Sequence, residues 1–146
     1  HCTTPLWICP ETEPSRKNVL LCIGGSEGAY RAADHVGHIL ANHDQHSVTL
    51  FTVSNAIGAD PGDVFQRAEY ILRENGVSSE RINRKSSWGL SIPGSILSEA
   101  QQGGYAAVAV GMHGQGHGLM RDLNMVGGTT SKLINKLEKT ALWCCP

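Results

Sequence analysis

The sequence predicts an α/β protein built on a doubly wound, five-stranded parallel sheet. Short, continuous apolar segments alternate with segments of helical periodicity, two of the apolar segments end in glycine-rich turns, and the connections are short. Parallel strands buried on both faces are expected to consist of such uninterrupted apolar runs. Right-handed crossovers then give the strand order 3-2-1-4-5, counted along the chain.

The chain of 146 residues is long enough for one domain with a buried core. We divide it into an edge strand over residues 1–10, a polar linker over 11–17 and the α/β domain over 18–146. Residues 4–10 (TPLWICP) match residues 140–146 (TALWCCP) at five of seven positions. A repeat of long period suggests duplicated units, so we interpret residues 1–10 as the last strand of a preceding, similar domain. The alternative is a simple N-terminal edge strand.

The first strand of the domain spans residues 18–23, and a helix follows it directly. Ser26 is a favourable N-cap for this helix, whose apolar residues recur at helical spacing to about Asn42. Gly24 and Gly25 therefore lie in the turn between strand and helix, where a ligand can approach the backbone closely.

The remaining elements continue the alternation. In order, we expect strand 47–53, a helix opened by Asp60 as N-cap and ended by Gly76, a polar edge strand over 81–88, helix 91–103, strand 105–110, a helix capped by Thr129 or Thr130, and strand 141–145.

Charge and hydropathy exclude several classes of protein. The formal net charge is −1, so no basic field indicates a nucleic-acid partner or a membrane surface. No apolar run approaches 18 residues, and no segment resembles a secretory signal. We therefore expect a cytoplasmic protein.

The five cysteines are odd in number and form no CxxC pair, so we expect buried, reduced thiols. The similarity of the two terminal segments leaves a Cys9–Cys145 contact open. The histidines near the first helix, His35, His38, His43 and His46, have no clearly placed acidic or cysteine partner. We interpret them as a solvated surface and expect no metal site.

Two glycine-rich turns meet at the point where the strand order reverses. Gly24, Gly25 and Ser26 follow the first strand, and the loop beginning at Gly111 follows the fourth. Glycine backbone and the N–H groups at the start of the next helix favour an anion such as phosphate. P-loop, dinucleotide-binding and nucleophile-elbow motifs are absent from the sequence, so binding is more strongly indicated than catalysis.

In this order, the segments resemble a universal stress protein domain, which has the adenine nucleotide alpha hydrolase-like α/β fold. The resemblance runs from about Lys17 to Pro146. The segments that carry it are NVLLCIGGSEGAYRAADHV, SVTLFTVSN, YAAVAVGMHG and VGGTTSKLINKLEKTALWCC. It implies a stress-response or regulatory role and binding of ATP or AMP, with Mg²⁺ accompanying ATP.

The resemblance also implies a nucleotide-binding site. Its candidate residues are Gly24, Gly25, Ser26, Val53, Gly111, Met112, His113, Gly114, Gly127, Gly128, Thr129 and Thr130. Here the Val53 backbone would meet the adenine edge, Gly111 and Met112 would border the ribose, and the later loop residues would donate to phosphates. Ordinary turn and cap chemistry is the alternative for the glycines and threonines.

The sequence departs from the family's pattern at two places. ATP-binding members have G-x2-G-x9-G-[ST] after the fourth strand, whereas thirteen residues separate Gly114 from Gly128 here. Gly24 stands where the family commonly has an Asp that helps to hold the nucleoside. The loss of this hydrogen-bond acceptor is expected to weaken binding by about 1–3 kcal/mol.

Two further expectations follow from the resemblance. Members of the family dimerise through the last strand, which pairs antiparallel with its counterpart. This predicts a homodimer or a tandem pairing through Ala141 to Cys145 and Pro5 to Cys9, with the N-terminal edge strand antiparallel to the last strand. In that case the domain can be a nucleotide-free structural partner that covers an apolar edge. Slow ATP hydrolysis or autophosphorylation on Thr129 or Thr130 is left open, although no general base is evident.

Overall fold

The computed structural model describes residues 4–11, 13–54, 60–112 and 129–146. In chain order its elements are β1 (Leu6–Ile8), β2 (Val19–Cys22), α1 (Glu27–Leu40), β3 (Val48–Ser54), α2 (Gly62–Glu74), a short 3₁₀ turn (Ser79–Arg81), β4 (Ile82–Trp88), α3 (Ile92–Gly103), β5 (Ala107–Gly111), α4 (Thr129–Lys136) and β6 (Ala141–Cys145).

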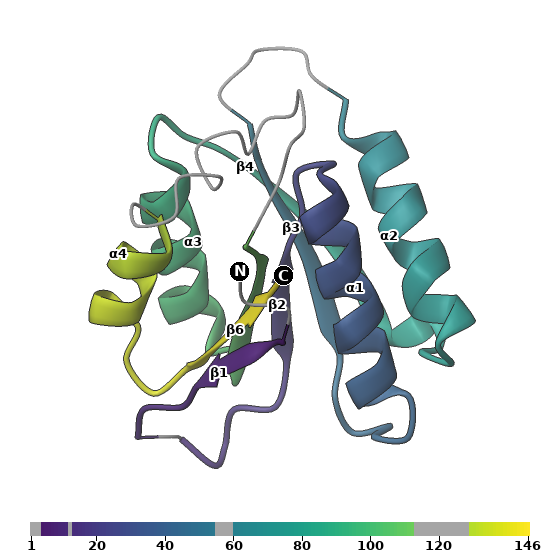
Figure 1. The fold of residues 1–146 in the computed structure, drawn as a ribbon, viewed down its shortest axis with the longest axis horizontal. Helices are drawn as coiled ribbons and strands as arrows, with labels where there is room; N and C mark the ends of the chain where they lie inside the picture. The colour runs from purple at the N-terminus through teal and green to yellow at the C-terminus, as the bar shows by residue number, and fades with distance from the viewer. Residues whose placement is uncertain (1–3, 12, 55–59, 113–128) are drawn as a thin grey trace.

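The predicted fold class is confirmed. The six strands form one sheet in the order β1-β6-β5-β2-β3-β4, in which only β1 is antiparallel to its neighbour. Helices α1 and α2 cover one face, and α3 and α4 cover the other (Figure 1). The central strand β2 shows why: Val19 and Leu21 pack towards α1 and α2, whereas Leu20 and Cys22 pack towards α3 and α4.

The predicted helix starts are correct at α1 and α3, but α2 begins slightly later than expected. The Ser26 hydroxyl accepts a hydrogen bond from the Ala29 N–H at 3.1 Å, as an N-cap should. Asp60 was expected to cap α2. Its carboxylate instead accepts from the N–H of Gly62 at 2.9 Å, two residues on, and Pro61 becomes the N-cap position.

Arg81 connects the end of α1 to the start of β4. Arg81 is 9% exposed, and its guanidinium donates to the carbonyl oxygens of Leu40, His43 and His46 at 2.9, 2.7 and 2.8 Å. Carbonyls at a helix end lack intrahelical partners, and Arg81 supplies one to Leu40, the last residue of α1. The sequence did not reveal this role, because a single arginine at the start of a polar strand looks like a surface residue.

Strand β1 pairs antiparallel with β6, as the fold prediction requires. Leu6 lies opposite Cys144, and Trp7 lies opposite Trp143 with their rings stacked at 4.8 Å. The Trp7 indole N–H donates to Nε2 of His35 on α1, at 3.1 Å. Contacts to both β6 and α1 therefore hold this three-residue strand in place.

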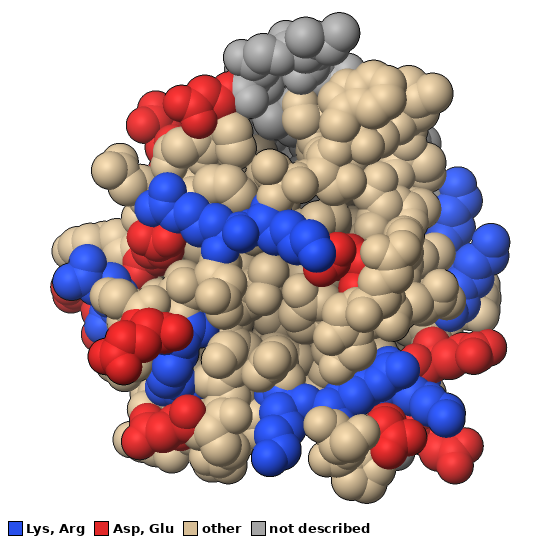
Figure 2. Space-filling model, turned by 180° about the vertical axis from the view of Figure 1, so that it is seen from behind, with Lys and Arg blue, Asp and Glu red and all other residues tan. Residues whose placement is uncertain are grey.

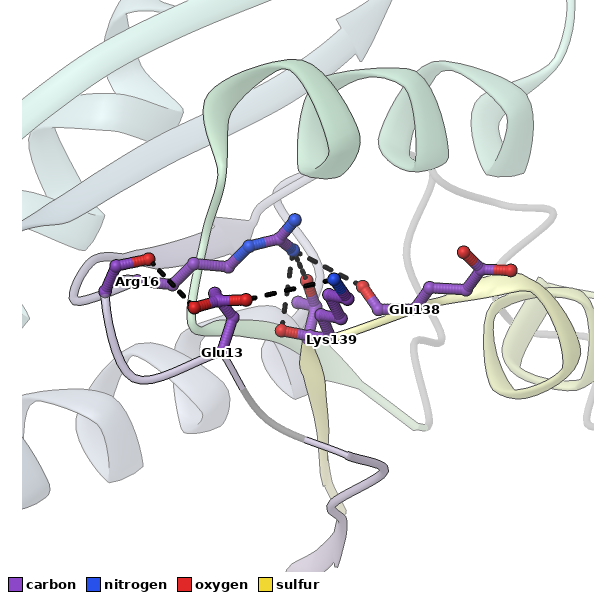
Figure 3. A network of polar contacts seen from close by, with 6 residues as sticks. Glu13, Arg16, Glu138 and Lys139 are labelled. Carbon is purple, nitrogen blue, oxygen red and sulfur yellow. Dashed lines mark hydrogen bonds and ion pairs between the residues drawn. The ribbon is translucent and has the colours of Figure 1, made fainter.

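The linker after β1 is fastened to the turn between α4 and β6 (Figure 3). The Arg16 guanidinium donates to the Thr140 hydroxyl at 2.7 Å and to the Glu138 and Lys139 carbonyls at 3.3 and 3.4 Å. The Lys139 ammonium lies 3.8 Å from the Glu13 carboxylate. These contacts fix the return of the chain from β1 to β2.

The expectation for the cysteines is right for three of the four described thiols and wrong for Cys9. Cys22, Cys144 and Cys145 are buried and free, and burial raises the pKa of Cys144 to about 11 and that of Cys145 to about 12. Cys9 is free and exposed. The Cys9–Cys145 contact does not form, because the register sets Leu6 and not Cys9 opposite this end of β6.

We predict that the attachment of β1 weakens in acid. Burial first, and then the charge of His38, lower the pKa of His35 below 6.5, although Asp34 opposes this. The unfolded chain therefore takes up the proton first, and stability falls as pH drops below 6.5 through the lowered pKa. A protonated His35 can no longer accept the Trp7 N–H bond.

The measurement is urea unfolding over a pH series for the wild type and for His35→Gln. Glutamine keeps an acceptor oxygen but does not titrate, so the difference between the two proteins isolates His35 from the other histidines. Identical pH slopes for the two proteins would contradict the prediction.

Candidate functional site

The candidate residues that follow β2, β3 and β5 meet where these strands end, at one edge of the sheet. Strands β5, β2 and β3 are neighbours and run parallel, so their carboxyl ends lie together. In the register, Cys22 of β2 lies beside Phe51 of β3, and the Ile23 N–H donates to the Phe51 carbonyl at 2.9 Å. Gly24 and Val53 are therefore adjacent where β2 ends.

The backbone of Val53 faces the space beyond the end of β2. In a strand, alternate residues direct their N–H and C=O groups to the same neighbour. Phe51 pairs with β2, so Val53, two residues later, directs its backbone groups to the same side. The Val53 side chain is fully buried. This residue thus offers only its backbone at the edge of the sheet.

The turn after β2 presents backbone atoms and one hydroxyl. Gly24 is buried, and Gly25 is exposed with φ +83°, a conformation that favours glycine. Ser26 then caps α1. Gly24 carries no side chain that could accept a hydrogen bond, so this turn can hold a ligand mainly through N–H groups near the start of α1.

Gly111, at the end of β5, lies directly against the first turn of α1. A Cβ atom at this position would lie 2.4 Å from the carbonyl carbon of Gly28 and 2.7 Å from the Ala29 nitrogen. Only glycine allows the strand and the helix backbone to approach this closely. The glycine is therefore explained by packing, whether or not a ligand is present.

Met112 follows β5, and its backbone N–H is already hydrogen-bonded to β6. Its N–H donates to the Cys145 carbonyl at 2.7 Å, and its partly buried side chain packs against the core on the α3 and α4 face. It can border a ligand by contact, but its N–H is used in the pairing with β6.

The rest of the candidate loop lies outside the described residues. This applies to His113, Gly114, Gly127 and Gly128. Thr129 and Thr130 are the first two residues of α4, a helix of eight residues. Of the twelve candidates, the described part thus brings together those of the first turn, Val53, Gly111 and Met112.

A charged cluster beside the first turn of α1 escaped the sequence prediction. The Arg67 guanidinium lies 3.9 Å from the centre of the Tyr30 ring and 3.1 Å from the Glu27 carboxylate. Burial raises the pKa of Tyr30, an effect that Arg67 opposes. The cluster joins α1 to α2, and spacing along either helix alone could not reveal it.

Other kinds of site find little support in the described residues. No three His, Cys, Asp or Glu side chains among them gather where they could hold a metal ion. None of the helices in these ranges is long and apolar enough to cross a membrane. On the face drawn in Figure 2, basic and acidic side chains are interspersed, unlike the continuous basic surface that nucleic acid favours.

The sequence matches no family model and no curated protein. Its structure is nevertheless similar to solved structures over most of its length. A universal stress protein in complex with cAMP is 17% identical with a TM-score of 0.69, covering 89% of this chain and 96% of that one. UspA, a universal stress protein from Lactobacillus plantarum, is 17% identical with a TM-score of 0.60, covering 90% and 99%.

A plant protein has the same fold. A universal stress protein family protein from Arabidopsis thaliana with AMP bound is 14% identical with a TM-score of 0.64, covering 88% of this chain and 90% of that one. At these identities the likeness establishes the fold, which is the one found in universal stress proteins.

We predict that Gly111→Ala destabilises the protein strongly. The new methyl group would overlap the backbone of Gly28, which cannot move aside without displacing α1. We expect the free energy of unfolding to fall by about 3 kcal/mol in urea titrations.

The matched control is Gly104→Ala. Gly104 has φ +60° but nothing within 4 Å of the added methyl group. The free energy of unfolding should therefore fall only by the cost of a left-handed alanine, about 1 kcal/mol. Equal losses at the two positions would mean that the contact between Gly111 and α1 is not tight.

Proposed function

We propose that this chain is a universal stress protein domain that binds an adenine nucleotide at the carboxyl edge of its sheet. The observation that carries the proposal is the meeting of three strand ends, where Gly24, Gly25 and Ser26 lie beside Val53 and Gly111. Two proteins of the same fold carry cAMP or AMP, which supports this class of ligand.

In the proposed complex, the ligand is held chiefly by backbone groups. The Val53 backbone meets the adenine edge, and Gly111 and Met112 border the ribose. The phosphates of AMP or ATP then lie towards Thr129 and Thr130 at the start of α4, where helix N–H groups favour an anion. Mg²⁺ accompanies ATP in this proposal, and the domain acts in regulation through nucleotide occupancy.

The absence of a carboxylate at position 24 defines a sharp test. We predict that Gly24→Asp binds AMP more tightly than the wild type, by about 5- to 150-fold, because the new acceptor restores about 1–3 kcal/mol of hydrogen bonding. Isothermal titration calorimetry with AMP, cAMP and ATP with Mg²⁺ measures the change. Gly24→Ala is the matched control, since it adds a methyl group without an acceptor.

The proposal fails if neither the wild type nor Gly24→Asp gives saturable heat with any of the three nucleotides while both unfold cooperatively. If Gly24→Ala tightened binding as much as Gly24→Asp, the gain could not come from the new hydrogen-bond acceptor.

A second function is favoured by the symmetry of the β1–β6 pair. The matching segments 4–10 and 140–146 correspond at a constant offset, so that Leu6 corresponds to Leu142, Trp7 to Trp143 and Ile8 to Cys144. The register sets Leu6 opposite Cys144 and Ile8 opposite Leu142. If each residue is replaced by its counterpart in the other segment, the pair of Leu6 and Cys144 becomes the pair of Leu142 and Ile8.

This pairing is therefore a local two-fold arrangement centred on Trp7 and Trp143, as expected when the same strand comes from two copies of a domain. We propose that β1 takes the position that β6 of a second copy would take. The domain then serves as a nucleotide-free structural partner, in tandem or as a homodimer.

Removal of residues 1–10 tests this function. We predict that the shortened chain forms a dimer at increasing concentration, because the edge of β6 becomes free to pair with itself. Light scattering after size exclusion measures the mass. A peptide of residues 4–10 should return the shortened chain to monomers, and Trp143→Lys in that chain should prevent dimers by placing two like charges at the centre. A shortened chain that stays monomeric at all concentrations contradicts the pairing.

A further inference from the structure

A cavity of about 330 Å³ lies at the amino edge of the sheet, at the opposite end of the strands from the proposed nucleotide site. It is open on one side and is bordered by the first residues of β2, β5 and β6, by the last turn of α1, and by β1. Its walls are mostly apolar and are formed by Trp7, Val19, Ile39, Ala107, Ala141 and Trp143.

The space exists because small side chains begin two of the strands. Ala107 and Ala141 are buried, and they leave room where β5 and β6 start. The stacked rings of Trp7 and Trp143 form another part of the wall. A concave, mainly apolar space of this volume with a few polar groups is typical of small-molecule sites.

The polar groups at this cavity are basic. Lys17, His43 and His46 line it, and none of the described lining residues is acidic. None of the ion pairs between described residues involves Lys17. An anionic group can therefore pair with the Lys17 ammonium without displacing a described acid.

The end of α1 would by itself disfavour an anion here, because helix carbonyls carry partial negative charge. Arg81 offsets this effect, since its guanidinium donates to the carbonyl oxygen of Leu40, the last residue of α1, and to those of His43 and His46 just beyond it. His46 fixes the backbone of Lys17. Its Nδ1 lies 2.6 Å from the Lys17 carbonyl, which can only accept, so Nδ1 carries the proton of this hydrogen bond.

We propose that this cavity binds a small aromatic carboxylic acid. The ring lies among the two indoles and the alanines, and the carboxylate pairs with the Lys17 ammonium. This site shares no residue with the proposed nucleotide site, so the two proposals stand or fall separately.

The test uses the full chain with two ligands of matched shape. Naphthoate carries the carboxylate, and naphthalenemethanol has the same ring system without charge. Amide NMR spectra should show saturable shifts for Ala106, Ala107 and Ala141 with naphthoate. The variant Lys17→Met should weaken naphthoate about 2- to 5-fold, as expected for a partly solvated ion pair, and leave naphthalenemethanol unchanged. Lys136→Met on α4 is the control and should change neither.

Cys9 gives an independent measurement, because this exposed thiol also lines the cavity. In a Cys2→Ser background, naphthoate should slow the reaction of Cys9 with a thiol reagent, whereas Cys22, Cys144 and Cys145 are buried and react slowly with or without ligand. The variant Ala107→Leu fills the cavity and should abolish the shifts and the protection.

Three results would overturn the proposal. They are the absence of saturable shifts at the three alanines, equal effects of Lys17→Met and Lys136→Met on naphthoate, and unchanged binding in a folded Ala107→Leu protein. If Ala107→Leu does not fold, the comparison of the two lysine variants decides alone.

Discussion

The close packing of α1 on β5 positions the rest of the structure. Backbone meets backbone where Gly111 lies against Gly28, and Ala29, Ala32 and Ala33 of the helix are buried in the core that it shares with Ala107 and Ala109. Small residues on both sides bring the helix axis close to the sheet. Helix α2 then approaches α1 through Gly37, where a Cβ atom would lie 2.8 Å from the Cβ of Asn75. Helix α1 runs from the carboxyl ends of the strands to their amino ends. Its placement therefore shapes both the carboxyl edge and the amino edge of the sheet.

The order of strands was predictable because it depends on local signals and on chirality. Continuous apolar runs such as VLLC in β2 identify buried parallel strands, and right-handed crossovers leave few arrangements for them. The repeated tryptophan segment predicted an edge strand antiparallel to β6, but it could not predict the register. The register depends on the stacking of Trp7 on Trp143 and on the bond from Trp7 to His35, which join residues far apart in the sequence.

The candidate site was predictable only as far as strand ends can be located. The positions of Gly24, Gly25 and Val53 follow from strand order and the common direction of parallel strands. The reason for Gly111 did not follow, since the sequence cannot distinguish a glycine required by ligand approach from one required by helix packing. Arg81 and the Arg67–Tyr30–Glu27 cluster were missed for a related reason. Each joins elements whose relative placement only the folded chain defines.

The polarity of the helices explains why the two edges need different chemistry to attract an anion. Every helix that follows a parallel strand runs back across the sheet, so helix N-termini gather at the carboxyl edge and C-termini at the amino edge. At the carboxyl edge, backbone N–H groups can meet a phosphate without any basic side chain, and glycines there only have to keep the approach open. At the amino edge the helix end repels an anion. A site for a carboxylate there requires side chains that reverse the local charge. Arg81 donates to the carbonyls of Leu40, His43 and His46, and Lys17 lines the cavity.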